Sequence, residues 1–174
     1  WYVAALSPDV GRNLKPVKLL SEAIVLYRMQ DGTPVALEDA CPHRKLPLSM
    51  GRLKDDAVEC GYHGLTFDRT GICIDAATQQ RIPPVCDKYG LLWIWMGDAS
   101  RAHADEILSI PTYADPAWHT TKGDSMSCAS HYLWLVDNLL DPSHVAWVHR
   151  DSFAGAGTDN TPLEFHVTEH GVVS

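Results

Sequence analysis

The sequence lacks an apolar run long enough to cross a membrane. Its densest apolar segment, residues 91–96, is far shorter than the roughly 20 residues that a membrane-spanning helix needs. No charged segment followed by an apolar one opens the chain, so we expect no signal peptide. The chain begins at Trp1 rather than at a methionine, which predicts that a few N-terminal residues are missing.

Positive charge is also scarce. The chain has 14 Lys and Arg residues against 22 Asp and Glu residues, which gives a formal net charge of −8, and it has no long basic run. Nucleic acid binding relies on clustered basic residues that neutralise phosphates. We therefore expect no nucleic acid partner.

A disulfide framework is absent as well. The five cysteines are an odd number and show no regular spacing. Apolar residues make up 45% of the chain and charged residues 21%, a balance that supports a packed core and argues against disorder. We therefore expect a folded protein in a reducing, cytoplasmic compartment.

The first hundred residues or so alternate short apolar or β-branched segments with turn signals. Asp31-Gly32 and residues 68–71 each predict a hairpin turn. This pattern is typical of an antiparallel all-β domain. The predicted strands are residues 1–6, 19–29, 34–38, 57–60, 65–67, 72–74 and 91–96, with a loop at residues 7–15.

A polar connection follows at residues 101–116, which contain Pro and Asp and resemble an interdomain linker. We place a domain boundary near residue 108, which gives expected domains of 1–108 and 109–174. Beyond the boundary, residues 130–140 are apolar over much of a helical circumference and predict a helix.

Pro142 should end or restart that helix, because it cannot donate to the helical ladder and crowds the carbonyl four residues earlier. Further along, residues 160–174 alternate polar and apolar side chains. This alternation indicates the beginning of a β-sheet.

Two short segments each carry a cysteine and a histidine. Cys41 and His43 are separated by one residue, and Cys60 and His63 by two. Both pairs lie at predicted strand ends, where a rigid scaffold can hold exposed ligands. Two thiolates and two imidazoles fit a [2Fe–2S] cluster with both Cys on one iron and both His on the other. They also fit a structural zinc site, although zinc fingers usually place a Cys pair first and a His pair second.

The C-x-H and C-x-x-H spacing resembles the Rieske family, and Arg44, Tyr62 and Gly64 beside the ligands strengthen the resemblance. The resemblance implies that the two Cys-His pairs bind the cluster. Gly61 and Gly64 flank the second pair and would let backbone amides approach the sulfurs. Ordinary turn chemistry explains these glycines equally well.

A second group of candidate metal ligands lies downstream, at Asn138, Asp141, His144 and His149. The first three are spaced by three residues, so they share one arc of a helix. The two histidines are five apart, about 140° out of line on a regular helix, so one ion would need a helix end or a π-type irregularity between them. Packing or capping is the alternative for the histidines, helix capping for Asp141, and a local hydrogen bond for Asn138.

The pattern N-x-x-D-x-x-H-x-x-x-x-H after a Rieske signature resembles the Rieske non-haem iron ring-hydroxylating oxygenases. The resemblance implies that His144 and His149 bind a mononuclear Fe(II) in a 2-His-1-carboxylate site, which leaves positions open for O₂. It also implies that Asp141 bridges His63 of one subunit and His144 of the next.

The branch of the family is indicated by Asn138, which stands where many members carry an acidic residue. Asparagine there resembles the vanillate and dicamba O-demethylases. The third iron ligand of the family is an aspartate far downstream of the histidines, so we expect it beyond Ser174. The acidic residues near this end do not occupy its position; they are Asp151, Asp159, Glu164 and Glu169.

The implied fold class is α+β, with an N-terminal all-β Rieske [2Fe-2S] domain and the start of an α+β, helix-grip-like catalytic domain for mononuclear iron, incomplete in this chain. The implied function is that of a terminal oxygenase component that oxidises an aromatic acid by O-demethylation or monooxygenation. Ring dihydroxylation, N-demethylation, and electron transfer without oxygenase activity are the alternatives.

The resemblance also implies partners. A separate ferredoxin or flavin reductase would oxidise NAD(P)H, because this chain has no G-x-G-x-x-G segment for a nicotinamide. The other implied partners are a small aromatic substrate, O₂, and further copies of the chain in a head-to-tail homotrimer.

Overall fold

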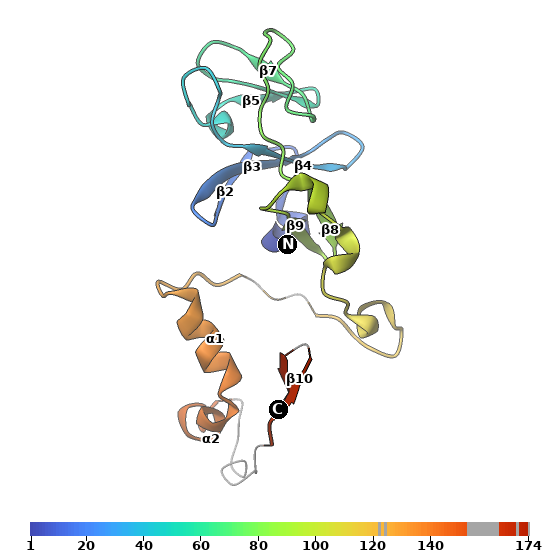
Figure 1. The fold of residues 1–174 in the computed structure, drawn as a ribbon, viewed down its shortest axis with the longest axis vertical. Coiled ribbons are helices and arrows are strands. Elements are labelled where there is room, and N and C mark those ends of the chain that lie inside the picture. Colours follow the sequence, from blue (N-terminus) through green and yellow to red (C-terminus); the bar gives the residue numbers. More distant parts are fainter. Residues whose placement is uncertain (122, 124, 153–163, 170, 174) are drawn as a thin grey trace. The chain divides into compact units, whose positions relative to one another are not determined.

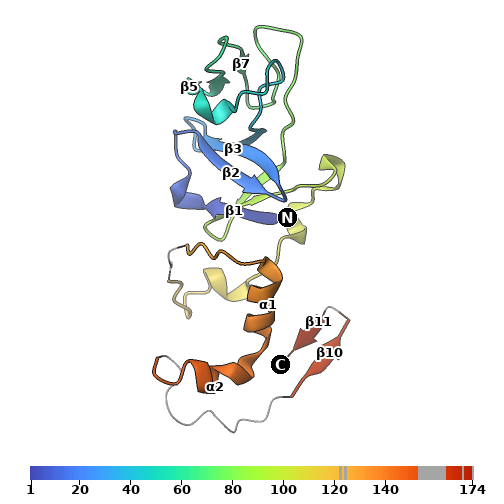
Figure 2. The same cartoon turned by 90° about the vertical axis from the view of Figure 1, so that its left-hand side faces the viewer.

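A computed structural model of the chain describes residues 1–121, 123, 125–152, 164–169 and 171–173. The chain divides into two compact units, Trp1–Thr120 and Thr121–Ser174 (Figures 1 and 2). No helix in the described ranges is both long enough and apolar enough to span a membrane.

The first unit contains three small antiparallel sheets of three strands each. The sheet orders are β1-β9-β8, β2-β3-β4 and β5-β6-β7. The strands are β1 (Tyr2–Leu6), β2 (Lys15–Leu19), β3 (Glu22–Arg28), β4 (Pro34–Glu38), β5 (Arg52–Lys54), β6 (Ala57–Glu59), β7 (Thr66–Phe67), β8 (Val85–Lys88) and β9 (Leu91–Ile94). Within this unit, the β2-β3-β4 sheet lies between the other two (Figures 1 and 2).

Strand β3 explains this layering because both of its faces are buried. Ile24 and Leu26 pack into one apolar cluster with Leu92 of β9. Val25 and Tyr27 point the other way, into a second cluster that contains Cys41, Cys60 and Phe67. A strand that is buried on both faces reads as a continuous apolar run rather than as an alternation. The second cluster joins the central sheet to the segments that carry the Cys-His pairs.

Tyr27 ties the two layers together through its hydroxyl, which donates to the backbone oxygen of Asp56 at 3.1 Å. Burial, and then the negative charge of Asp56, raise the pKa of Tyr27 to about 12. A raised pKa in the folded state favours the neutral phenol. Tyr27 therefore contributes its full share of stability below its ordinary pKa of 10.0 and loses it as the pH rises toward 12.

Tyr27→Phe should cost about 1 kcal/mol of unfolding free energy at neutral pH, because one buried hydrogen bond is lost. The variant should also show a smaller loss of stability between pH 10 and 12 than the wild type. Denaturant unfolding at neutral pH and within that alkaline range measures both effects. An equal loss of unfolding free energy between pH 10 and 12 in the wild type and the variant would contradict the role given to Tyr27.

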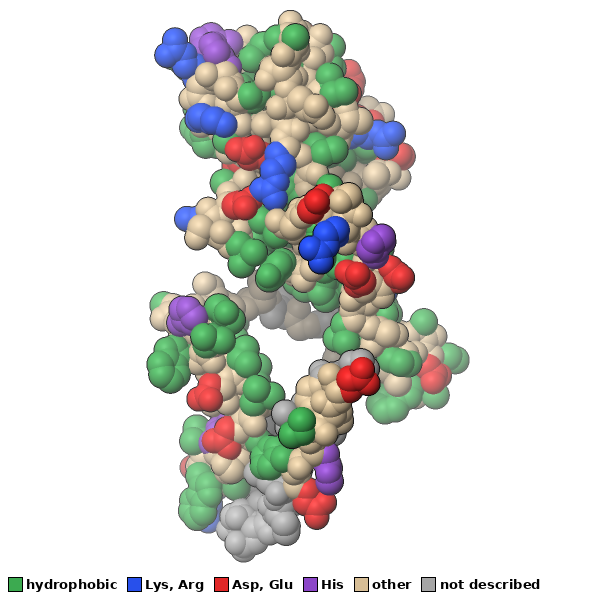
Figure 3. All heavy atoms as spheres, viewed as in Figure 1, with side chains coloured by type: hydrophobic (Ala, Val, Ile, Leu, Met, Phe, Trp, Pro, Cys, Tyr) green, Lys and Arg blue, Asp and Glu red, His purple; other side chains and the backbone are tan. Residues whose placement is uncertain are grey.

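The second unit contains α1 (Tyr132–Leu140), a 3₁₀ helix (Pro142–His144), α2 (Val145–Val148) and a hairpin of β10 (His166–Thr168) and β11 (Gly171–Val173). The imidazole of His131 caps α1 by accepting from the Leu133 N–H. Large apolar side chains on α1 are exposed within the described residues, and Figure 3 shows such side chains along this helix.

The predicted helix at 130–140 and its end before Pro142 are confirmed. The predicted strands are also confirmed, apart from 72–74, which contributes only two isolated bridges, Phe67 with Cys73 and Ile72 with Gln79. Strands β2, β5 and β8 were not predicted because they are short and carry charged side chains. The predicted β region at 160–174 contains β10 and β11, and its residues 160–163, 170 and 174 lie outside the described ranges.

Candidate metal centres

The two Cys-His pairs lie on two loops with the same backbone hydrogen bonding. In the loop at residues 41–46, the N–H of the first residue donates to the carbonyl of the last at 2.8 Å, and the N–H of the fifth donates to the carbonyl of the first at 2.8 Å. The loop at residues 60–65 repeats both bonds, at 2.8 and 3.0 Å. Each loop thus closes on itself at its cysteine and presents the histidine from its middle.

The fifth residue of each loop is left-handed, with φ of 57° at Lys45 and 77° at Gly64. A Cβ on Gly64 would meet nothing within 4 Å, so a side chain there is opposed by backbone strain alone. Gly64→Ala should therefore lower the unfolding free energy by about 1 kcal/mol. Lys45→Ala is the matched control: it already has a Cβ in this conformation, and it should change stability by less than about 0.5 kcal/mol. Unfolding of both variants tests the comparison, and equal losses would refute it.

The two histidines converge through the same ring atom. His43 Nδ1 lies 3.2 Å from His63 Nδ1, and both side chains are exposed. Two nitrogens bound at about 2.1 Å to one tetrahedral metal would be about 3.4 Å apart. The observed separation therefore suits a single metal ion that both Nδ1 atoms bind. Figure 3 shows histidine at the surface beside basic side chains, at the end of the first unit that carries β5 and β7.

The two cysteines lie on the buried side of the same loops, with 2% of Cys41 and 3% of Cys60 exposed. Burial and the nearby Cys60 thiol raise the pKa of Cys41, while the backbone amides of His43 and Arg44 act in the opposite direction by donating to its sulfur. Backbone amides that donate to a cysteine sulfur also tune the reduction potential of an iron–sulfur cluster.

The donor set therefore consists of two pairs, a buried sulfur pair and an exposed nitrogen pair. Among the described residues, no three His, Cys, Asp or Glu side chains converge as ligands for a single metal ion. A two-iron cluster takes its ligands pairwise, one pair on each iron. The residues present thus fit a [2Fe–2S] cluster.

The downstream motif brings Asn138, Asp141 and His144 together. The amide nitrogen of Asn138 lies 3.4 Å from His144 Nε2, and His144 Nδ1 hydrogen-bonds the backbone oxygen of Asp141. A carbonyl oxygen only accepts, so Nδ1 carries the proton and Nε2 keeps its lone pair. This is the usual way in which a ligating histidine is oriented.

His149 lies close to His144, with ring centroids 5.4 Å apart and planes at 63°. The intervening backbone passes from the 3₁₀ helix into α2, which ends at Val148 and leaves His149 as its C-cap. The sequence spacing required a helix end between the two imidazoles, and the structure has this irregularity.

Asp141 contacts its own chain by capping the 3₁₀ helix. Its carboxylate accepts from the Ser143 N–H at 3.0 Å and from the Ser143 hydroxyl. These two bonds, with a smaller contribution from His144, lower the pKa of Asp141. The carboxylate is therefore ionised at neutral pH. The capping alternative is present in the structure, and the bridging role remains a prediction.

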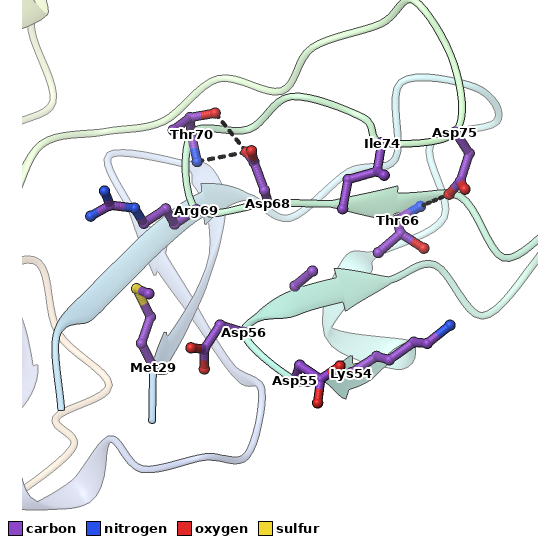
Figure 4. Close-up of a pocket in the computed structure, with 11 residues that line it drawn as sticks. Met29, Lys54, Asp55, Asp56, Thr66, Asp68, Arg69, Thr70, Ile74 and Asp75 are labelled. Carbon is purple, nitrogen blue, oxygen red and sulfur yellow. Dashed lines mark hydrogen bonds between the residues drawn. The ribbon is translucent and has the colours of Figure 1, made fainter. Parts of the chain in front are cut away.

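A hollow of about 660 Å³ lies elsewhere on the first unit, and no Cys or His of the two loops lines it (Figure 4). Four aspartates lie around it, but three of them already accept internal hydrogen bonds. Asp56 accepts from the Gln30 N–H, Asp68 from Thr70, and Asp75 from the Thr66 N–H. These carboxylates hold the surrounding backbone in place, and among the described residues they form no group of three metal-ligating side chains.

These features together define an iron–sulfur protein with a second histidine motif after its cluster loops. Residues 1–88 match the Rieske [2Fe-2S] domain, and residues 128–174 match the vanillate O-demethylase oxygenase C-terminal domain. The chain therefore belongs to the Rieske family, in the group of oxygenase components that carry this C-terminal domain.

Curated relatives agree with this placement. A putative toluene-4-sulfonate monooxygenase system iron-sulfur subunit of Comamonas testosteroni is 41% identical, over 92% of this chain and 47% of the relative. The oxygenase component of dicamba O-demethylase of Stenotrophomonas maltophilia is 39% identical, over 91% of this chain and 48% of the relative. The chain spans about half the length of the curated relatives it matches.

Solved structures agree as well. Dicamba monooxygenase bound to 3,6-dichlorosalicylic acid superposes with a TM-score of 0.88 at 36% identity, over 99% of this chain and 53% of that chain. The predicted α+β fold class, with a mostly β Rieske domain followed by part of a catalytic domain, is confirmed. The predicted boundary near residue 108 lies between the two family matches, while the compact units separate after Thr120, and it remains a prediction.

Proposed function

We propose that this chain is part of a terminal oxygenase component that receives electrons at a Rieske cluster and activates O₂ at a mononuclear Fe(II). The cluster half of the proposal is carried by the 3.2 Å separation of the two histidine Nδ1 atoms, on the same loops as a buried cysteine pair. The oxygenase half is carried by His144 and His149, whose ring centroids lie 5.4 Å apart. The proposed cluster ligands are Cys41, His43, Cys60 and His63, and the proposed iron ligands are His144, His149 and an aspartate beyond residue 174.

When bound, the cluster supplies one-electron transfer at a potential of about −150 to +300 mV, and the iron supplies O₂ activation. The chain's own residues hold these groups in place. The exposed His43 and His63 keep their Nε2 atoms directed away from the shared metal position. In this proposal Asp141 accepts from Nε2 of His63 of one subunit and orients His144 of the next.

The proposed chemistry is O-demethylation or monooxygenation of an aromatic acid. In the demethylation, a methyl ether, O₂, two electrons and two protons give a phenol, formaldehyde and water. Two relatives named as dicamba and vanillate O-demethylases support this choice. N-dealkylation is the second candidate, because a 33% identical relative is named chloroacetanilide N-alkylformylase. Ring dihydroxylation and simple electron transfer remain alternatives, and the His144–His149 pair argues against the latter.

The proposed setting is a cytoplasmic homotrimer served by a ferredoxin or flavin reductase. Its two domains would be 1–108, which holds the cluster, and 109–174, which begins the catalytic domain. The exposure of His63 and of Asp141 supports a contact between subunits, because each leaves polar atoms accessible. Asn138 lies beside His144, with its amide nitrogen 3.4 Å from the Nε2 atom that would bind the iron, so it would line the iron site and turn its amide away from Nε2 when iron is bound.

The proposal is tested by turnover of the full-length protein with a reductase, NADH and a panel of methoxylated and N-alkylated aromatic compounds. Formaldehyde released from methoxylated aromatic acids, in proportion to O₂ consumed, is the expected result. Release from the N-alkylated compounds alone would favour the second candidate. If the cluster is reduced but no compound gives product, the proposed oxygenase function is rejected and electron transfer becomes the supported function.

A further inference from the structure

Two polar side chains, Asp39 and Gln80, are buried in the first unit, with 7% and 4% exposed. The side-chain amide of Gln80 donates to the carbonyl of Glu38 at 3.1 Å and to the carbonyl of Ala40 at 2.6 Å. Burying a polar group costs free energy unless its hydrogen bonds are made. Here the bonds of Gln80 go to the stretch that leads directly into Cys41.

The peptide group between Ala40 and Cys41 is consequently held at both ends. Its oxygen accepts from Gln80, and its N–H donates to the carbonyl of Leu46 at 2.8 Å, across the first ligand loop. A peptide group is planar, so fixing both of its polar atoms fixes its orientation. The direction in which the Cys41 side chain leaves the backbone is thereby set from outside the loop.

Asp39 connects the same stretch to the structure behind the second loop. Its carboxylate accepts from the Ser49 N–H at 2.7 Å and from the Ser49 hydroxyl at 2.6 Å. Ser49 lies in the 3₁₀ helix Leu48–Met50, whose last residue lies against the second loop. A Cβ on Gly61 of that loop would lie 3.0 Å from the Met50 carbonyl oxygen.

We propose that Asp39 and Gln80 are positioning residues that hold the two ligand loops at the separation and orientation that the two-iron cluster requires. The inference rests on the proposed function, and it extends the proposed cluster site to residues that touch no metal. Asp39 sets the distance between the loops through Ser49, and Gln80 sets the orientation of the entry to Cys41. Residues that orient metal ligands govern how tightly the metal is held and its electronic properties.

The experiment compares Asp39→Ala and Gln80→Leu with wild-type holoprotein. Both variants should lose cluster iron to a chelator about 10-fold faster, and both should shift the g-values of the reduced cluster in EPR. Asp39→Asn should rescue the EPR spectrum, because its amide oxygen can still accept from the Ser49 N–H. This rescue is not expected of a residue that acts only through its charge.

Control variants show whether changing an aspartate or glutamine elsewhere in the first unit affects the cluster. Asp98→Ala removes an exposed aspartate that also accepts from the N–H and hydroxyl of one serine, Ser100, away from both loops. Gln79→Leu changes the exposed neighbour of Gln80. Both controls should keep the wild-type EPR spectrum and rate of iron release.

Wild-type spectra and release rates in Asp39→Ala and Gln80→Leu would overturn the inference. If Asp39→Ala fails to fold, the test rests on Gln80→Leu, which removes both hydrogen bonds to the stretch before Cys41. A wild-type spectrum and release rate in Gln80→Leu would then overturn the inference. If the wild-type protein holds an intact cluster and the variants leave its EPR spectrum and iron-release rate unchanged, this inference alone fails. If the wild-type protein binds no iron and no labile sulfide, the proposed function fails as well.

Discussion

Replacing His144 or His149 with alanine is expected to reduce product formation by at least about 100-fold, the upper end of the loss seen when a residue that merely supports a metal ligand is removed. The reason is that each imidazole supplies one of the bonds that hold the mononuclear iron. The first unit contains none of these atoms, so the EPR signal and the visible spectrum of the Rieske cluster should stay at wild-type intensity. Product assays and EPR on the same full-length preparation measure both results.

His119→Ala is the control for this experiment, because it removes an exposed histidine that lies outside both motifs. It should leave turnover and cluster spectrum unchanged. Continued turnover in His144→Ala or His149→Ala, at a rate near that of the control, would remove these histidines from the iron site and with them the oxygenase assignment.

Asp141→Asn is expected to keep both metal centres and to slow electron delivery between them by about 10- to 100-fold. Asparagine can still accept from the Ser143 N–H, and it is as good a helix cap as aspartate, so the backbone should hold. What it loses is the negative charge, which Asp141 carries at neutral pH because its pKa lies below the ordinary carboxyl value. Single-turnover oxidation of the pre-reduced cluster, followed with substrate and O₂ present, measures the rate.

Asp137→Asn makes the same charge change on α1 and should leave the single-turnover rate unchanged. If Asp141→Asn is as fast as this control, then Asp141 is a helix cap only. A loss of iron from Asp141→Asn would instead show that the carboxylate supports the iron ligands rather than the path between centres.

Candidate metal ligands could be proposed from sequence because metal chemistry restricts the residue types. Few arrangements other than a metal site explain two Cys-His pairs at these spacings. The structure adds what spacing cannot give: the histidines meet through Nδ1, and the cysteines are buried behind them. The end of α1 before Pro142 could also be expected from that proline, and an irregularity between His144 and His149 from their five-residue spacing if both bind one ion.

The supporting residues could not be predicted in this way. Asp39 precedes Cys41 by two residues and looks like any polar residue at a strand end, and Gln80 lies in a segment without a motif. Their importance depends on burial and on partners distant in sequence, such as Ala40 for Gln80. The short charged strand β5 (Arg52–Lys54) escaped prediction for a related reason, since its pairing with β6 is decided by tertiary context.

The most direct test of the central claim is the iron and acid-labile sulfide content of the purified protein, combined with EPR of the reduced form. The account predicts about two labile sulfides per chain, iron in at least equal amount, and the EPR signal of a histidine-ligated [2Fe–2S] cluster. Substitution of His43 or His63 should abolish that signal. Zinc without labile sulfide, and no EPR signal on reduction, would show that the four residues form a structural zinc site instead.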